Sequence, residues 1–395
     1  EVGALHRVNI ASNYLDAVDA LSTWNVPAMN FHIAQRDGTV ASIVAGVIPH
    51  RVGVDPLLPS PSWDATAGWN GLIHLKALGT VVKRGHGSVA SANNRPVASG
   101  TPFISTIFEP SSRIERITEL LGVYKDMSVR DAQVMQQDVT SLFAVRFTQQ
   151  IIPHLDRASK QYSDVEKRAL ALMKKWDGQL TTVDPAASLH AVLLQRLIWN
   201  TFEDELGTQL FYDWVFIGSN PVKRIEELLV EPQHRLFDNV RTKARENLTW
   251  MVVKSFHEAV AHLQDTFDSN EPSTWLYGKL HGVTFPHLFG AHPLMRPVMN
   301  AGPYEVGGST TTIFNTEWAI HKPYEAIVTA SGRVISDLAD SVQYTVLPGG
   351  VSGQPLDAHY TDQMQLWLKG GYVRVPCSRR PDITFRLYEI LVPGS

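Results

Sequence analysis

The sequence predicts an α+β fold for this chain of 395 residues. Its beginning and end are rich in Gly and Pro with strand-like patterns, whereas its middle shows helical periodicity. Strands and helices do not alternate regularly, which argues against a doubly wound parallel sheet. We expect one composite domain with three regions: a strand- and loop-rich 1–112, a mainly helical 113–270, and a strand- and loop-rich 271–395 that returns to the core.

Composition excludes several classes of protein. With 44% hydrophobic residues, the chain is long enough to bury a sizeable core. A net charge of -4 without a basic run argues against nucleic acid as a partner. No apolar run reaches the ~18 residues of a membrane span, so none is predicted. The single Cys377 forms no internal disulfide, and we expect a buried, inert thiol.

The strongest local signal in the first region is a β-hairpin. Strand-like runs at 31–34 and 40–44 flank Asp37-Gly38, and such a pair between β-prone runs favours a tight turn. The segment 49–71 then holds several prolines and two tryptophans. We expect it to form a long surface loop that packs on its own aromatic side chains.

Helical periodicity begins near Arg113, where apolar residues recur at helical spacing. The run Ser128-Val129-Arg130-Asp131 is typical of a helix N-terminus. Further helices are expected over 132–150, 165–176, 187–205 and 237–263. In the last region we expect strands at 333–338 and 344–347, followed by a helix near 362–368.

Histidines are the first candidates for chemistry. His257 and His262 almost match the zinc-protease helix, but their i, i+5 spacing places them about 140° apart on a helix, so this motif is excluded. His281, His287 and His292 could ligate a metal, yet their spacing fits no common zinc pattern and no Cys or carboxylate lies among them. Hydrogen-bonded structural histidines are the favoured interpretation.

Ser352 lies in a Gly-rich run that suggests a nucleophilic serine. The nucleophile elbow needs a glycine two residues after the serine, and position 354 is Gln. We therefore place Ser352 in a tight loop. Phosphate-binding loops, EF-hand loops and dinucleotide fingerprints are absent.

The run Ala90-Ser91-Ala92-Asn93-Asn94-Arg95-Pro96, followed by the helix start Arg113-Ile114-Glu115-Arg116-Ile117, resembles a signature of the penicillin acylase family, also called penicillin amidases. Further runs that resemble the family follow in order over most of the chain. The most specific is 347–355 together with 359–363. The others are 26–31, 57–59, 63–71, 137–141, 176–178, 277–281 and 307–309.

The resemblance implies an N-terminal nucleophile hydrolase with a four-layer αββα sandwich, cut from a precursor. The first residue of the large subunit attacks the amide, and its own α-amino group acts as base, so no cofactor is required for the chemistry. Because residue 1 is Glu, we expect the C-terminal part of a large subunit, inactive alone. Its partners would be the remaining segments of the precursor, namely the small subunit and the nucleophile-bearing segment. The family implies a periplasmic or extracellular location.

Four residues match functional positions of the family. Asn93 matches the amide that donates to the tetrahedral oxyanion, although a turn-forming Asn is the plain alternative. Arg113 matches the arginine beside it, with Arg116 as the competing assignment one turn later. Met29 and Phe31 lie where the family builds part of its acyl pocket, or they belong to an ordinary core.

A structural calcium is an option rather than an expectation. Pro56 matches a position that donates a backbone carbonyl to calcium in the family, but 97–102 lacks the carboxylate that commonly follows the Asn-Asn-Arg run. The substrate is expected to be a small acyl amide, with β-lactam side chains, N-acyl homoserine lactones and other lipidated amides left open. The rival hypothesis is a non-catalytic, acylase-like structural or interaction subunit of a larger assembly.

Overall fold

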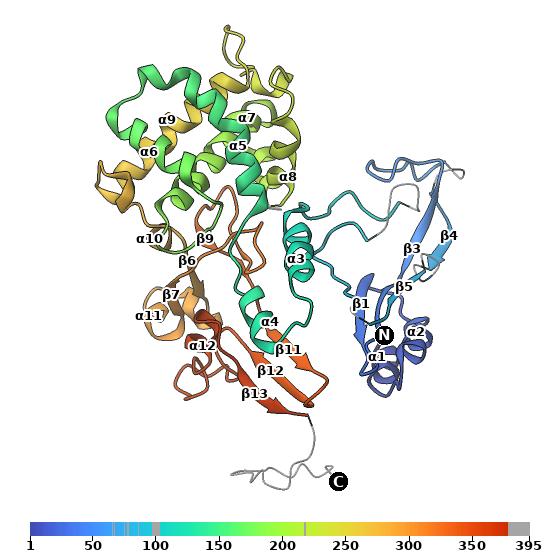
Figure 1. Ribbon diagram of the computed structural model, residues 1–395. Helices are drawn as coiled ribbons and strands as arrows, with labels where there is room; N and C mark the ends of the chain where they lie inside the picture. The colour runs from blue at the N-terminus through green and yellow to red at the C-terminus, as the bar shows by residue number, and fades with distance from the viewer. Residues whose placement is uncertain are drawn as a thin grey trace.

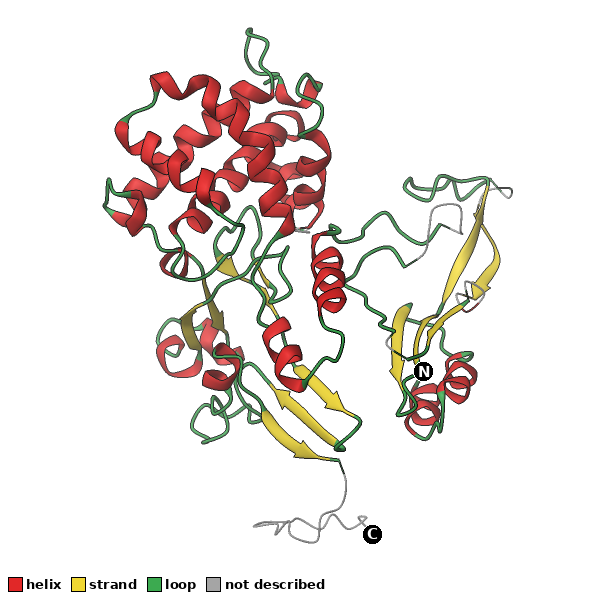
Figure 2. Cartoon of the chain, viewed as in Figure 1, coloured by secondary structure: helices red, strands yellow, loops and turns green. Residues whose placement is uncertain are grey.

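The computed structural model describes residues 1–377 apart from 65, 67, 75, 77, 78, 86, 97–102, 217 and 218. Helices of the middle of the chain gather in one body, and strands occur towards both ends (Figures 1 and 2). This mixture confirms the α+β prediction.

The first strands form a sheet in the order β1-β2-β5, with β1 at Met29–Ala34, β2 at Val40–Ala45 and β5 at Thr80–Lys83. β1 and β2 are antiparallel and turn at Gly38, whose φ of 83° suits glycine, so the hairpin prediction is confirmed. Helices α1 (Val2–Asn9) and α2 (Tyr14–Leu21) supply apolar side chains to a small core with this sheet.

The prediction of a long loop over 49–71 is wrong at both ends. β3 (Val47–Val52) and β4 (Gly68–His74) pair antiparallel, with an irregularity in register after Pro49. A proline is tolerated there because, among the described strands, β3 pairs with β4 alone and so has one open edge. Trp63 and Trp69 are 87% and 71% exposed, so the expected packing of these aromatics is wrong too.

The helix predicted over 132–150 is two helices, α4 (Val129–Met135) and α5 (Leu142–Ala158). The Ser128 capping box with Asp131 starts α4, which confirms the N-terminal signal. α5 begins anew because the Ser141 hydroxyl accepts from the backbone N–H of Ala144. The helix predicted near Arg113 is confirmed as α3 (Ser112–Val123).

Helices α5 to α9 enclose the largest hydrophobic core. α7 runs from Pro185 to Val215 with non-helical backbone at Gly207. α9 begins at Leu248, later than predicted, because Asn247 caps it. The other helices of this body are α6 (Asp164–Lys175) and α8 (Ser219–Leu228), and short 3-10 turns occupy Ser159–Gln161, Arg235–Phe237, Pro272–Thr274 and Leu288–Ala291.

Phe256 tests this core. Its side chain on α9 is fully buried and lies 5.2 Å from Tyr162, measured between ring centroids. We expect Phe256→Ala to lower the free energy of unfolding by about 3–5 kcal/mol, because the site loses apolar burial and leaves a cavity. Urea unfolding of the complete protein measures it. Trp250→Ala, at a 44% exposed position on the same helix, is the control, and an equal cost for both variants would contradict the assignment.

The last region forms three small sheets, in the orders β7-β6-β9, β10-β8 and β11-β12-β13. Trp367 and Phe314 lie in a hydrophobic cluster to which the first and the third of these sheets contribute. The strands and the helix predicted after 333 are confirmed. The elements are α10 (Tyr277–Leu280), β6 (Gly282–Phe285), α11 (Arg296–Met299), β7 (Ala301–Glu305), β8 (Thr316–Glu317), β9 (Glu325–Ala326), β10 (Val328–Thr329), β11 (Arg333–Asp337), β12 (Val342–Val346), α12 (Met364–Leu368) and β13 (Val373–Pro376).

Two remaining expectations concern membranes and the thiol. None of the helices in the described ranges is long and apolar enough to cross a bilayer. Cys377 is exposed, so its predicted burial is wrong. It directly follows β13, which among the described strands pairs with β12 alone.

Candidate active site

Asn93 lies in an exposed turn with a backbone φ of 59°, a left-handed conformation that asparagine adopts more readily than most residues. Its carbonyl oxygen accepts from the backbone N–H of Glu109 at 3.2 Å. Its side-chain oxygen Oδ1 accepts from Nη2 of Arg113 at 3.1 Å. The neighbouring Asn94 closes the turn, because its Oδ1 accepts from the N–H of Ala92 at 3.0 Å.

The contact with Arg113 determines which way the Asn93 amide faces. A guanidinium only donates hydrogen bonds, so the amide oxygen must face it and the NH₂ group must face elsewhere. Among the residues described here, no acceptor is bound to Nδ2 of Asn93. This exposed amide is therefore a neutral donor whose oxygen is held by Arg113 and whose NH₂ group is not bound by any residue of the described ranges.

Arg113 lies in the first turn of α3, and only 14% of its side chain is exposed. Oε2 of Glu109 lies 3.5 Å from its Nη2. The third charged group is Glu317 on β8. Burial raises the pKa of the Glu317 carboxyl, the charge of Glu109 raises it further, and Arg113 opposes both. Arg113 thus pairs with Glu109, donates to the Asn93 amide, and lowers the raised pKa of Glu317 through its charge.

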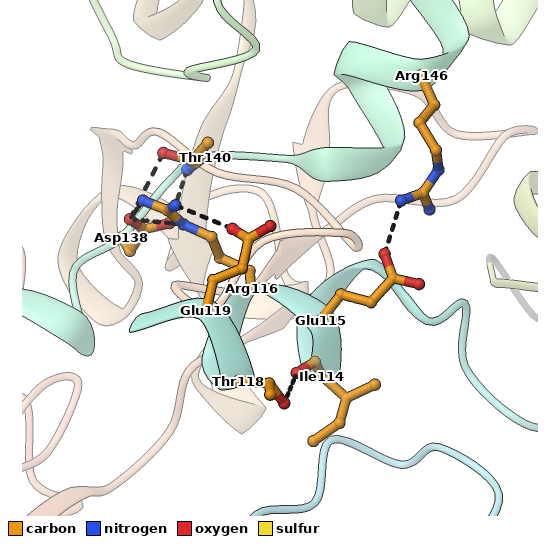
Figure 3. A network of polar contacts seen from close by, with 8 residues as sticks. All are labelled: Ile114, Glu115, Arg116, Thr118, Glu119, Asp138, Thr140 and Arg146. Atoms are coloured by element: carbon orange, nitrogen blue, oxygen red, sulfur yellow. Dashed lines mark hydrogen bonds and ion pairs between the residues drawn. The ribbon is translucent and has the colours of Figure 1, made fainter. Parts of the chain in front are cut away.

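Arg116, the competing assignment, is engaged elsewhere. Figure 3 shows it beside Asp138, whose Oδ2 lies 2.7 Å from Arg116 Nη2, while Glu119 lies 3.3 Å from Nη1. The Asp138 carboxylate also accepts from the N–H of Thr140. Arg116 therefore fixes α3 to the segment before α5, and the structure brings Arg113 to Asn93 instead.

A second ion pair fixes the other side of α3. Figure 3 shows Arg146 of α5 facing Glu115. The ion-pair distances are 2.6 Å from Arg146 to Glu115 and 2.7 Å from Arg146 to Glu226 of α8. These contacts join α3 to two helices of the helical body. The helix that carries Arg113 is thus supported by charged contacts in two directions.

The structure does not bring Met29 or Phe31 into a described contact with Asn93. Met29 is 45% exposed at the start of β1, and Phe31 packs edge-on against Trp24 in the small core. Asn30, which points to the opposite sheet face, donates to the Ser91 hydroxyl at 3.1 Å. Sequence reasoning missed Asn30. The alternation of side chains along a strand could have found it, because it places Asn30 on the face opposite to Phe31.

A recess of about 100 Å³ lies between this sheet face and the turn that carries Asn93. Polar side chains from β1, β2 and the turn line it, namely Asn30, His32, Ser42, Ser91 and Asn94, and Val81 of β5 adds an apolar side chain. It adjoins the turn of the proposed donor, and its lining is more polar than that of an ordinary core.

Each of the three clustered histidines makes hydrogen bonds, as the structural interpretation expects. His281 is buried, and its two ring nitrogens lie 2.8 Å from the Tyr324 carbonyl oxygen and 3.1 Å from the Thr316 hydroxyl. His287 and His292 accept from nearby backbone N–H groups. Within the described ranges, no group of three or more His, Cys, Asp or Glu residues is arranged to hold a metal ion.

His281 gives a pH prediction. Burial lowers its pKa from 6.5 to about 4. As pH falls from 6.5 towards 4, His281 becomes protonated in the unfolded chain but stays neutral in the folded chain. The free energy of unfolding therefore falls over this window. We expect His281→Asn to make the fall shallower, measured by urea midpoints at pH 7, 5.5 and 4. His292→Asn, at an exposed position, should keep the wild-type slope, and an unchanged slope in His281→Asn would contradict the assignment.

Two other candidates are resolved differently. Ser352 lies in a tight loop as predicted, because its hydroxyl accepts from the Gln354 N–H and its own N–H donates to the His359 carbonyl.

For calcium, Pro56 follows Asp55, whose carboxylate accepts from the Leu57 N–H. The segment 97–102 lies outside the described residues. Calcium binding therefore stays a prediction, and no chemistry is assigned to calcium.

Comparison with known proteins places this geometry in context. The family model described as penicillin amidase matches residues 1–382. The acyl-homoserine lactone acylase QuiP of Pseudomonas putida is 28% identical over 95% of this chain and 48% of its own length. The QuiP of Pseudomonas aeruginosa is 27% identical over 90% and 45%, and the penicillin acylase 2 proenzyme of a Pseudomonas species is 25% identical over 92% and 46%.

The chain thus spans about half the length of the curated relatives it matches. Among solved structures, the thermostable penicillin G acylase from Alcaligenes faecalis is similar with a TM-score of 0.69. The similarity covers 99% of this chain and 72% of that chain at 16% sequence identity. At this identity, the likeness shows the fold.

Proposed function

Because the chain belongs to the penicillin amidase family, we propose that it forms part of an amide hydrolase that acts by acyl transfer. The nucleophile is an N-terminal residue of another segment of the same precursor, and its α-amino group acts as base. Asn93 of this chain donates to the oxyanion. Arg113 holds the Asn93 amide.

The observation that carries this proposal is the contact between Arg113 and Oδ1 of Asn93. When the nucleophile attacks the amide carbon, negative charge develops on the carbonyl oxygen. A neutral, fixed N–H donor stabilises that charge without reorganisation. The amine then leaves, and water hydrolyses the acyl-enzyme. Met29 and the recess beside Asn30 are the places in this chain where we propose contact with the substrate.

The partners are the remaining segments of the precursor, a small subunit and a nucleophile-bearing segment. Two findings support this: the chain spans about half of its curated relatives, and one of them is named as a proenzyme. We propose export to the periplasm or the outside. For the substrate, the QuiP relatives favour an N-acyl homoserine lactone as the first acyl amide to test.

The experiment uses the full-length protein that contains this chain. Intact-mass analysis and N-terminal sequencing of all co-purifying chains should find one that begins with Ser, Cys or Thr. Hydrolysis of N-dodecanoyl-homoserine lactone and penicillin G is followed by release of the primary amine. If no such chain is found and neither probe is cleaved, the hydrolase proposal fails and the non-catalytic subunit replaces it.

A further inference from the structure

We propose that Glu109 is a positioning residue, which keeps the Asn93 amide in its donating orientation by holding both the Asn93 backbone and Arg113. The inference rests on the proposed role of Asn93 as oxyanion donor. It concerns the described loop that precedes α3, a segment with no role in the family motifs recognised in the sequence.

The first contact is made by the backbone. The Glu109 N–H donates to the Asn93 carbonyl oxygen at 3.2 Å. Asn93 has a left-handed backbone, which is unfavourable for most residues and persists only where the surroundings hold it. This hydrogen bond ties the strained turn to the loop that leads into α3.

The second contact is made by the side chain. Oε2 of Glu109 is buried and lies 3.5 Å from Arg113 Nη2, the same nitrogen that donates to Asn93 Oδ1. The exposed fractions of the two side chains are 20% for Glu109 and 14% for Arg113, so water screens this pair only partly. The Glu109 charge therefore acts on the nitrogen that orients the donor.

Glu317 explains why the position of Arg113 depends on Glu109. Glu317 lies on β8 and also attracts the Arg113 guanidinium. The Glu109 carboxylate lies 3.5 Å from Arg113 Nη2, the nitrogen that donates to Asn93 Oδ1. Without that charge, Glu317 is the remaining carboxylate partner, and its attraction is no longer balanced. The guanidinium would then shift, and the Asn93 amide would lose its fixed orientation.

A double-mutant cycle in the full-length protein tests the inference, with N-dodecanoyl-homoserine lactone as the probe. We expect Glu109→Gln, which keeps the backbone N–H, to lower kcat about 10- to 100-fold with KM unchanged, the scale of effect for a misplaced group. In an Asn93→Ala background, Glu109→Gln should cause no further loss. Glu119→Gln, a half-exposed carboxylate on α3 that pairs with Arg116, should keep wild-type turnover.

Glu317→Gln provides a readout that a merely structural role would not give. In the Glu109→Gln background, Glu317→Gln removes the other carboxylate that attracts Arg113. The double variant should therefore recover part of the kcat that Glu109→Gln loses. Glu109→Asp, which keeps the charge, should lose less than Glu109→Gln, and it replaces that variant in the cycle if Glu109→Gln does not fold. Thermal unfolding of each variant verifies that it is folded.

The outcomes separate the two proposals. Full turnover in Asn93→Ala overturns the proposed function and this inference with it. Two results overturn only the role of Glu109, provided that Asn93→Ala loses activity. One is a wild-type kcat in Glu109→Gln, and the other is a double variant in which the two losses multiply.

Discussion

Replacing Asn93 by alanine in the complete, processed protein is expected to lower the acylation rate by about 10² to 10³, the usual loss for one oxyanion donor. The fold and substrate binding should stay nearly intact, because Asn93 is exposed and its side chain contacts the protein through Arg113. Pre-steady-state release of homoserine lactone from the acyl probe measures the acylation step.

The left-handed backbone of Asn93 calls for matched controls, because alanine is itself strained there. Asn93→Gly removes that strain along with the donor and should lose as much activity as Asn93→Ala. Asn93→Asp keeps a residue type that tolerates the conformation, but a carboxylate repels the developing oxyanion, so it should be at least as harmful. If Asn93→Ala kept full turnover, or lost it only by unfolding, the assignment would be wrong.

Local signals predicted the fold well where neighbouring residues decide the structure. The hairpin around Asp37-Gly38 and the start of α4 at Ser128 depend on turn and capping chemistry within a few residues. The break before α5 was missed although its cap is local, since the Ser141 hydroxyl accepts from the Ala144 N–H, and the same hydroxyl also contacts a distant segment. There the Ser141 hydroxyl is 2.6 Å from the hydroxyl of Thr311. Apolar periodicity alone does not reveal such a contact.

The candidate site divides in the same way. Asn93 and Arg113 were found through family motifs, and the structure places them in contact, although their roles in catalysis stay a prediction. Glu109 had a weak local signal, since it precedes Arg113 by four residues. Glu317 had none, because it lies on β8, far from Arg113 in the sequence, and the two charges interact only in the folded chain.

The strand-rich beginning of the chain also bears on how the chain behaves without its partners. β3 and β4 form a two-stranded sheet, an arrangement that is marginal in water without a covering layer. The connection between them exposes Leu57, Leu58 and Trp63, at 60%, 64% and 87%, and Trp69 on β4 is 71% exposed. Large apolar side chains gathered on one exposed element are typical of a surface that another segment covers.

We therefore expect residues 1–395 expressed alone to aggregate, whereas co-expression with the remaining segments of the precursor should yield soluble protein. Unpaired strand edges and exposed tryptophans favour association between copies when the covering segment is missing. Size-exclusion chromatography with light scattering measures the difference. Trp63→Ser combined with Leu57→Ser should reduce aggregation of the isolated chain, because it removes apolar area from the exposed connection. A stable monomer that unfolds in one cooperative transition would show instead that these 395 residues form a self-sufficient core.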